Sequence, residues 1–345
     1  MLISIIWIAI FFGIVALLRF IFSPYFTWKK QMKNRSSINN SRIHTKNKTY
    51  TFEEYKKLNN DYFFSMVIPA YNEEARIAKM LKEHIKYFEN YAGFKGKKYE
   101  VIIVNDCSKD KTSEIAKSFF TFEGKDVDLK VVEYQQNLGK GGAVRTGMLL
   151  SSGQYTLMVD ADGATDINCF DKVFKKVDNQ YKIYKIRSLF IDININLIKL
   201  NQLQQIEKNG LGIAVGSRSH LDKESVAKRK FYRKILAFFS NFIVQVICGV
   251  KLNDTQCGFK LFTKKTTEVI FGVQHLERWA FDVEILMVGN HYKMPVAEVP
   301  VNWEDVDGSH LNVIEASVTM ARDFLMVRLL YLLGVWKYND SIYKS

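Results

Sequence analysis

The segment Met158-Val159-Asp160-Ala161-Asp162-Gly163-Ala164-Thr165 places two acids directly after an apolar run that begins at Tyr155. Such a run, ended by a turn sequence, is typical of a buried parallel strand. Open α/β sheets bind ligands at the carboxyl ends of their strands, so we expect Asp160 and Asp162 to lie in a crevice. Carboxylates at this spacing can hold a divalent cation, which in turn binds a diphosphate. The alternative is an Asp-rich turn that only closes the strand.

The composition suits one large catalytic domain with appendages and an anionic partner. The chain has 345 residues, and its 49 Lys and Arg against 36 Asp and Glu give a net charge of +13. Phosphorylated substrates and membrane lipid both suit this charge. Because we find no RNA- or DNA-binding signature, we expect no nucleic acid partner. The four cysteines lack the paired spacing of a metal site and indicate free thiols in a reducing cytosol.

An apolar segment at the start of the chain predicts a membrane anchor. Residues 2–22 are apolar except for one serine, one glycine and one arginine. At about 1.5 Å per residue, a helix of this length spans roughly the 30 Å of a hydrocarbon core. No basic residue precedes the segment and no small-residue cleavage site follows it, which favours an uncleaved transmembrane helix at 1–24 over a signal peptide. The basic residues that follow predict a cytosolic catalytic domain, which a polar linker at 25–60 would join to the anchor.

The next part of the chain alternates predicted strands with predicted helices. Apolar runs indicate four strands, at 62–71, 99–105, 129–134 and 155–159. Apolar residues recur at helical spacing between these runs, and Asn72 is expected to cap the first of the helices. This alternation predicts an α/β fold, Rossmann-like, with a mostly parallel sheet flanked by helices. We assign residues 61–312 to this domain.

The segment 137–147, between the third and fourth strands, is rich in glycine. It lacks the spacing of a P-loop and of a dinucleotide-binding loop. Its glycines would let a helix approach the sheet closely. The alternative interpretation also places Lys140 and Arg145 beside a diphosphate at the amino end of that helix.

The regular alternation is interrupted after the fourth strand. Residues 179–210 are biased towards Asn, Ile, Lys, Leu and Gln, which predicts a surface insertion without catalytic residues. A strand is expected at 211–216, followed closely by Arg218. The segment 228–248 is basic and then apolar, and it predicts a helix that either belongs to the core or lies at the bilayer surface.

The segment 278–284 begins a further helix and carries two acids. Asp282 and Glu284 point in different directions on a helix, so at most one is expected to face the site. Either could instead be an acid that the helix dipole favours. Residues 313–345 predict an amphipathic helix and a tail at the membrane surface, because their charged residues make them a poor membrane span.

Seven motifs occur in the order found in one enzyme family. They are VIPAYNEE (67–74), VNDCSKD (104–110), NLGKGGAVRTG (137–147), VDADGAT (159–165), GSR (216–218), DTQCGFKLF (254–262) and RWAFDVE (278–284). On these motifs the chain resembles the family 2 inverting glycosyltransferases, which have the GT-A fold, and among them the dolichyl-phosphate β-glucosyltransferases. The resemblance covers residues 66–312 without the insertion. The chain departs from the family at Cys107, where Gly is usual.

The resemblance implies a nucleotide-sugar site. Its residues are expected to be Pro69, Ala70, Tyr71, Glu73, Asp106 and Asp160, joined by Lys140 from the glycine-rich segment. Asp106 matches the acid that reads the uracil base. Asp160 and Asp162 match the acids that hold the ribose and a Mg²⁺ or Mn²⁺ ion on the diphosphate.

A second set of residues is expected at the acceptor. Arg218 and one of Arg229 or Arg233 are similar to the arginines that receive the lipid phosphate. Arginine suits this task because its planar fork pairs with two phosphate oxygens. The candidate catalytic residues are Asp162, Arg218, Asp282 and Glu284.

The activity that the resemblance implies is transfer of glucose from UDP-glucose to dolichyl phosphate with inversion, which gives dolichyl β-D-glucosyl phosphate for protein N-glycosylation. The expected location is the endoplasmic reticulum membrane, with a single span and a cytosolic catalytic domain. Two alternatives stay open: a mannosyltransferase that uses GDP-mannose, and a catalytically inactive membrane adaptor that binds nucleotide. The presence of both Asp160 and Asp162 disfavours the adaptor.

Overall fold

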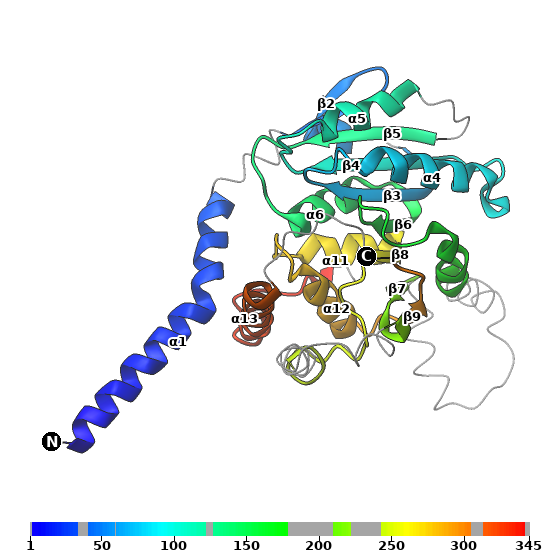
Figure 1. Ribbon diagram of the computed structural model, residues 1–345. Helices are drawn as coiled ribbons and strands as arrows, with labels where there is room; N and C mark the ends of the chain where they lie inside the picture. The colour runs from blue at the N-terminus through cyan, green and yellow to red at the C-terminus, as the bar shows by residue number, and fades with distance from the viewer. Residues whose placement is uncertain are drawn as a thin grey trace, which may run out of the picture.

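A nine-stranded sheet in the order β2-β1-β5-β4-β3-β6-β8-β7-β9 runs through the molecule (Figure 1). The computed structural model describes residues 2–33, 41–58, 60–121, 127–178, 210–221, 243–304 and 313–341. The central strands are β5 (Val127–Glu133), β4 (Tyr99–Asn105), β3 (Tyr62–Ala70) and β6 (Gly153–Val159). All three pairings among these strands are parallel, which confirms the α/β prediction and the four predicted strands.

The sheet changes direction beyond β6. Strand β8 (Phe259–Thr263) is antiparallel to both of its neighbours, β6 and β7 (Ile213–Ser217). Strand β9 (Val296–Pro300) then pairs with β7 in parallel. The prediction of a mostly parallel sheet therefore holds for the centre of the sheet, where the predicted acids follow the strands.

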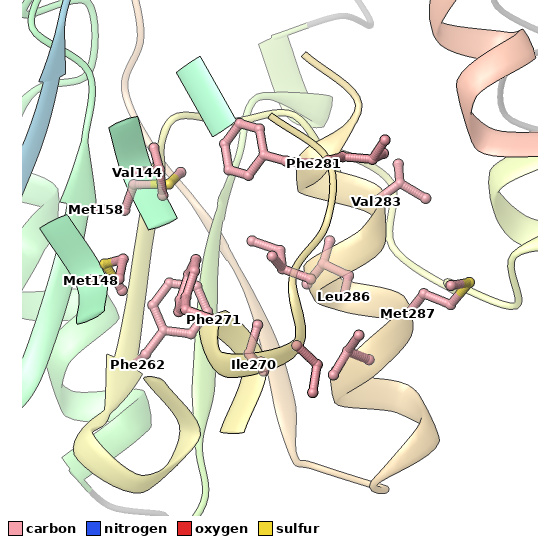
Figure 2. Close-up of a cluster of buried hydrophobic side chains, with 14 of the residues drawn as sticks. Val144, Met148, Met158, Phe262, Ile270, Phe271, Phe281, Val283, Leu286 and Met287 are labelled. Atoms are coloured by element: carbon pink, nitrogen blue, oxygen red, sulfur yellow. The ribbon is translucent and has the colours of Figure 1, made fainter. Parts of the chain in front are cut away.

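Helices cover both faces of the sheet and enclose two hydrophobic cores. Helices α6 (Lys140–Leu150), α11 (Lys264–Val273) and α12 (Phe281–His291) contribute to the first core, part of which is drawn in Figure 2. Helices α4 (Ile77–Asn90) and α5 (Thr112–Ser118) contribute to the second. In β3, Val67 belongs to the first core, while its neighbours Met66 and Ile68 belong to the second, as the alternation of side chains in a strand requires.

The linker prediction for 25–60 is wrong for part of that range. Strand β1 (Arg42–His44) pairs antiparallel with β5, and β2 (Thr49–Thr51) pairs with β1. Helix α3 (Phe52–Lys56) follows, and a capping box between Thr51 and Glu54 begins it. Ile43 of β1 is fully buried in the first core, so this segment is part of the folded domain.

The helix that follows β3 begins later than predicted. Asn72 does not cap α4, because its backbone has the left-handed φ of 55° and its side chain accepts a hydrogen bond from Lys109 N at 2.9 Å. Glu73 N donates to Thr112 Oγ1 at 2.7 Å, and Glu74 N donates to Asp110 Oδ2 at 3.1 Å. These bonds tie the loop after β3 to the loop after β4, and both loops lie at the same edge of the sheet.

Helix α1 (Leu2–Lys33) extends away from the sheet (Figure 1). Ile21, Phe22 and Tyr25, in the second half of this helix, pack against the first core. In the part of the chain that the structure describes, no helix has the combined length and apolar character of a membrane span. The transmembrane helix predicted at 1–24 stays a prediction.

Helix α13 (Val313–Leu332) uses one of its faces to cover the first core. Phe324, Met326 and Val327 are fully buried there. The amphipathic pattern predicted for 313–345 therefore reflects packing against protein on this face, and a membrane-surface role stays a prediction. Apart from Gly210, the predicted insertion at 179–210 lies outside the described residues.

Candidate active site

The acids predicted to form a site follow neighbouring parallel strands. Asp106 comes directly after β4, and its backbone N–H donates to the carbonyl of Ala70, the last residue of β3, at 2.9 Å. Asp160 comes directly after β6. The carboxyl ends of these strands meet at one edge of the sheet, as expected for a ligand crevice. Tyr71, which follows Pro69 and Ala70 at the end of β3, is exposed at this edge.

The two acids that follow β6 affect the pKa of Glu73. Burial raises the pKa of Glu73, its ion pair with Arg76 opposes that rise, and the charges of Asp162 and Asp160 add to it. The ion pair joins Arg76 Nε to Glu73 Oε2 at 2.7 Å. Glu73 therefore lies within electrostatic range of the Asp160 and Asp162 pair.

Asp160 is held against the backbone of a glycine. Its N–H donates to the carbonyl of Gly258 at 3.1 Å, and a Cβ at position 258 would overlap the Asp160 carboxylate. Lys140 Nζ lies 2.7 Å from Asp160 Oδ1. Gly258, in the turn before β8, is thus a site residue that the sequence argument did not single out.

Asp160 and Asp162 carry the carboxylates predicted to hold a divalent cation. Asp160 Oδ1 is buried, and apart from the Lys140 ion pair no described residue gives it a hydrogen bond. Asp162 is half-buried, and its Oδ1 accepts from Ala164 N at 3.0 Å. No cluster of three or more His, Cys, Asp or Glu arranged to hold a metal occurs in the described ranges. Two carboxylates suit Mg²⁺, which takes its other ligands from phosphates and water.

Asp106 fixes the start of the glycine-rich loop. Its two carboxylate oxygens accept hydrogen bonds from Leu138 N at 2.7 Å and Gly139 N at 2.8 Å. Burial raises the pKa of Asp106 to about 6, although these two bonds oppose the rise. The predicted contact with uracil stays a prediction, whereas the support of the loop is a role that the motif did not indicate.

Two glycines of helix α6 permit close contact with other parts of the chain. A Cβ on Gly141 would lie 2.6 Å from the carbonyl oxygen of Leu276, and one on Gly147 would overlap Val67 of β3. The close approach of helix and sheet predicted for this segment is confirmed. Lys140 reaches Asp160, but the Nε of Arg145 donates to the carbonyl of Phe271 in α11 at 3.0 Å. Arg145 thus contacts α11 while Lys140 contacts an acid of the site.

Asp282 belongs to the same charged cluster as Lys140. Its carboxylate forms a buried ion pair with Lys260 of β8. Burial raises the pKa of Asp282. The charges of Lys260 and Lys140 oppose this rise, and the charge of Asp160 adds to it. Lys260 was not predicted as a site residue.

Glu284 makes a different set of contacts. Its carboxylate accepts from His275 N at 2.9 Å, Leu276 N at 2.7 Å and the hydroxyl of Tyr331 in α13 at 3.1 Å. Glu284 therefore joins the loop before α12 to α13. Of the two acids, Asp282 is the one that lies near Lys140 and Asp160, and the expectation that at most one of them faces the site stays a prediction.

Arg218 is held in one orientation just beyond the end of β7. Its Nε and Nη2 donate to the two carboxylate oxygens of Asp254 at 2.7 and 2.9 Å, and its guanidinium lies 5.3 Å from the ring centre of Trp303. Burial would lower the pKa of Arg218, but Asp254 raises it, with a smaller contribution from Asp160. Asp254 N in turn donates to Glu298 Oε1 at 3.1 Å. Arg229 and Arg233 lie outside the described residues.

Two relatives of this chain carry the same name, and a family model also matches it. Residues 65–271 match the model of Glycosyl transferase family 2. The chain is 42% identical over 293 residues to a dolichyl-phosphate β-glucosyltransferase of Dictyostelium discoideum, a match that covers 83% of this chain and 80% of the relative. Its identity to the human dolichyl-phosphate β-glucosyltransferase is 40% over 282 residues, covering 80% and 78%.

Solved structures resemble the fold more distantly. Glucosyl-3-phosphoglycerate synthase from Mycobacterium tuberculosis, in complex with UDP, has 17% sequence identity and a TM-score of 0.42, with 83% of this chain and 85% of that chain covered. The family match and the identities to the relatives decide the assignment. The chain belongs to glycosyl transferase family 2, within the family of dolichyl-phosphate β-glucosyltransferases.

Proposed function

We propose that this enzyme transfers glucose from UDP-glucose to dolichyl phosphate with inversion, at the endoplasmic reticulum membrane, in support of protein N-glycosylation. One observation of the geometry carries the proposal. At the carboxyl ends of the strands, Asp160 lies within electrostatic range of Arg218, which the Asp254 carboxylate holds in a fixed orientation, and Asp162 follows two residues later in the chain. The names of the relatives supply the substrate class.

The donor half of the site comprises the loops after β3, β4 and β6. Asp160 and Asp162 would hold Mg²⁺ or Mn²⁺, which when bound would stabilise the negative charge of the departing UDP. Lys140, whose ammonium pairs with Asp160 in this structure, would supply a further positive charge to the diphosphate. Asp106 keeps the loop that precedes Lys140 in place through Leu138 and Gly139.

The acceptor half of the site is organised around Arg218. Asp254 engages Nε and Nη2, so the guanidinium is oriented before substrate binds and retains further N–H donors for a phosphate. This arrangement lowers the conformational entropy that a free arginine would lose on binding. Arg229 and Arg233 remain candidates for a second contact to the same phosphate.

The reaction needs positioning more than proton removal. A phosphate monoester has a second pKa of about 6, so the acceptor is mostly a dianion at neutral pH. One of its oxygens forms the new bond to the anomeric carbon while the bond to the diphosphate oxygen breaks, and UDP leaves with the electron pair. Asp282 is paired with Lys260, and we assign it to holding the charged cluster together; its predicted part in catalysis and that of Glu284 stay predictions.

Membrane attachment would bring the site to its lipid substrate. Several large apolar side chains of α1 are exposed, among them Trp7, Phe11 and Phe12. Exposed apolar surface of this extent is typical of a segment that contacts lipid or protein. An anchored enzyme meets dolichyl phosphate at a raised effective concentration, with the catalytic domain on the cytosolic side.

The test compares two donors with one acceptor. Purified full-length protein in dolichyl-phosphate vesicles is given UDP-glucose or GDP-mannose, each with and without a chelator. The proposal predicts glucosyl lipid from UDP-glucose and loss of product with the chelator. Product from GDP-mannose alone would identify the mannosyltransferase, and UDP-glucose binding without product would identify the inactive adaptor.

A further inference from the structure

Lys140 occupies the place on Asp160 that the proposed cation needs. Its ammonium lies 2.7 Å from Asp160 Oδ1, and this ion pair is the sole polar contact of that buried oxygen within the described part of the chain. A divalent cation bound to the same oxygen would be in contact with the ammonium. Like charges at such a separation repel strongly in a partly buried site, so Lys140 and the cation cannot share Asp160.

The surroundings of Lys140 would let its ammonium move while its backbone stays fixed. Lys140 is the first residue of α6, and the preceding Gly139 is anchored by Asp106. Gly142 N donates to the carbonyl of Glu277 at 2.9 Å, which holds the first turn of the helix. The side chain itself is held by charge: burial would lower the pKa of Lys140, but Asp160, and then Asp282, raise it. A lysine is a point charge on a flexible stem, so it can change partners by rotation alone.

We propose that Lys140 is an exchangeable partner of Asp160. It neutralises Asp160 while the crevice holds no donor, and it moves to the diphosphate of the nucleotide sugar when the divalent cation takes its place. This inference rests on the proposed function, because it requires a cation on Asp160 and a diphosphate beside it. Lys140 then opposes the binding of the cation alone and favours the binding of the nucleotide, so that the two are bound together.

The opposite signs of these two effects give the test. Mn²⁺ binding to the full-length protein without nucleotide is measured by water-proton relaxation, and UDP binding is measured by calorimetry in saturating Mn²⁺. Removal of one competing ion pair in Lys140→Met is expected to tighten Mn²⁺ binding about 10-fold and to weaken UDP binding about 10-fold. Lys140→Arg keeps the charge beside Asp160 and should leave Mn²⁺ binding near that of the unchanged protein.

A second Lys–Asp pair provides the control. Lys175 Nζ lies 2.6 Å from Asp171 Oδ2, and both side chains are solvent-accessible, so Lys175→Met removes the same charge and should change neither affinity. Thermal unfolding of each variant shows that it is folded. Mn²⁺ binding by Lys140→Met that is unchanged, weaker or absent would overturn the exchange. The donor and chelator assay of the unchanged protein is independent of this result, so the proposed function can stand when the exchange fails.

Discussion

At the residue scale, Asp106 makes donor binding depend on pH. Its carboxylate accepts two backbone N–H groups of the glycine-rich loop, and protonation would turn one acceptor oxygen into a donor that faces an N–H. Because its pKa is raised to about 6, we expect the affinity for UDP-glucose to fall as the pH is lowered from 7 to 5. UDP-glucose itself has no group that titrates in this range, and calorimetry at a series of pH values would measure the effect.

The pH dependence of the free energy of unfolding has the opposite sign to that of donor binding, so the two effects of Asp106 can be told apart. The folded pKa of Asp106 lies above its ordinary value of 3.8, so ionised Asp106 is disfavoured in the folded chain. Its contribution to the free energy of unfolding therefore falls as the pH rises from about 4 to about 6. Lost binding at low pH thus cannot come from Asp106 destabilising the fold. The same pH profile in Asp106→Asn as in the unchanged protein would contradict this assignment.

Gly258 is a second residue whose role can be tested singly. An alanine Cβ at this position would overlap the Asp160 carboxylate, so Gly258→Ala must displace a proposed cation ligand. A displacement of about 1 Å near the reacting groups can lower turnover about 100-fold, while overpacking at one site lowers the free energy of unfolding by about 1–3 kcal/mol. Turnover and thermal unfolding are measured together. Gly13→Ala, where a Cβ would meet no atom within 4 Å, is the control, and full activity in Gly258→Ala would refute the assignment.

At the element scale, Glu284 holds α12, α13 and the loop before α12 together. In Glu284→Gln an amide N–H₂ would face one of the backbone N–H groups of His275 and Leu276, which leaves a buried donor unsatisfied. We expect the free energy of unfolding to fall by about 1–3 kcal/mol, with kcat of the folded enzyme nearly unchanged. Chemical denaturation measures the first quantity, and Glu268→Gln, exposed on α11, is the control. A large loss of kcat at unchanged stability would instead support the catalytic role predicted for Glu284.

Elements with a strong local pattern could be predicted from the sequence, and those fixed by distant contacts could not. The runs that became β3, β4 and β6 are almost fully buried, so their apolar character was sufficient. Strands β1 and β2 have three residues each, too few for a periodic signal. Strand β1 is placed by pairing with β5, and β2 by pairing with β1. Lys260 was not predicted because its partner in the buried ion pair, Asp282, lies on another element of the fold.

At the scale of the whole molecule, the sheet brings together residues that are far apart in the chain. The acids after β6 and Arg218 after β7 lie on either side of β8, the strand between them in the sheet. The loop that carries Gly258 precedes β8 and connects the two, because Gly258 contacts Asp160 while Asp254 holds Arg218. The order of motifs in the sequence indicated the family, whereas the topology places the proposed donor and acceptor residues at the ends of strands of one sheet.

The division of the proposed site into a donor half and an acceptor half is the central claim, and the KM values of Arg218→Lys test it most directly. Lysine keeps the charge but loses the fork that Asp254 orients. The account predicts a KM for dolichyl phosphate raised about 10-fold or more, since a bidentate contact becomes a single one, with the KM for UDP-glucose unchanged. A raised KM for UDP-glucose with an unchanged KM for dolichyl phosphate would contradict it.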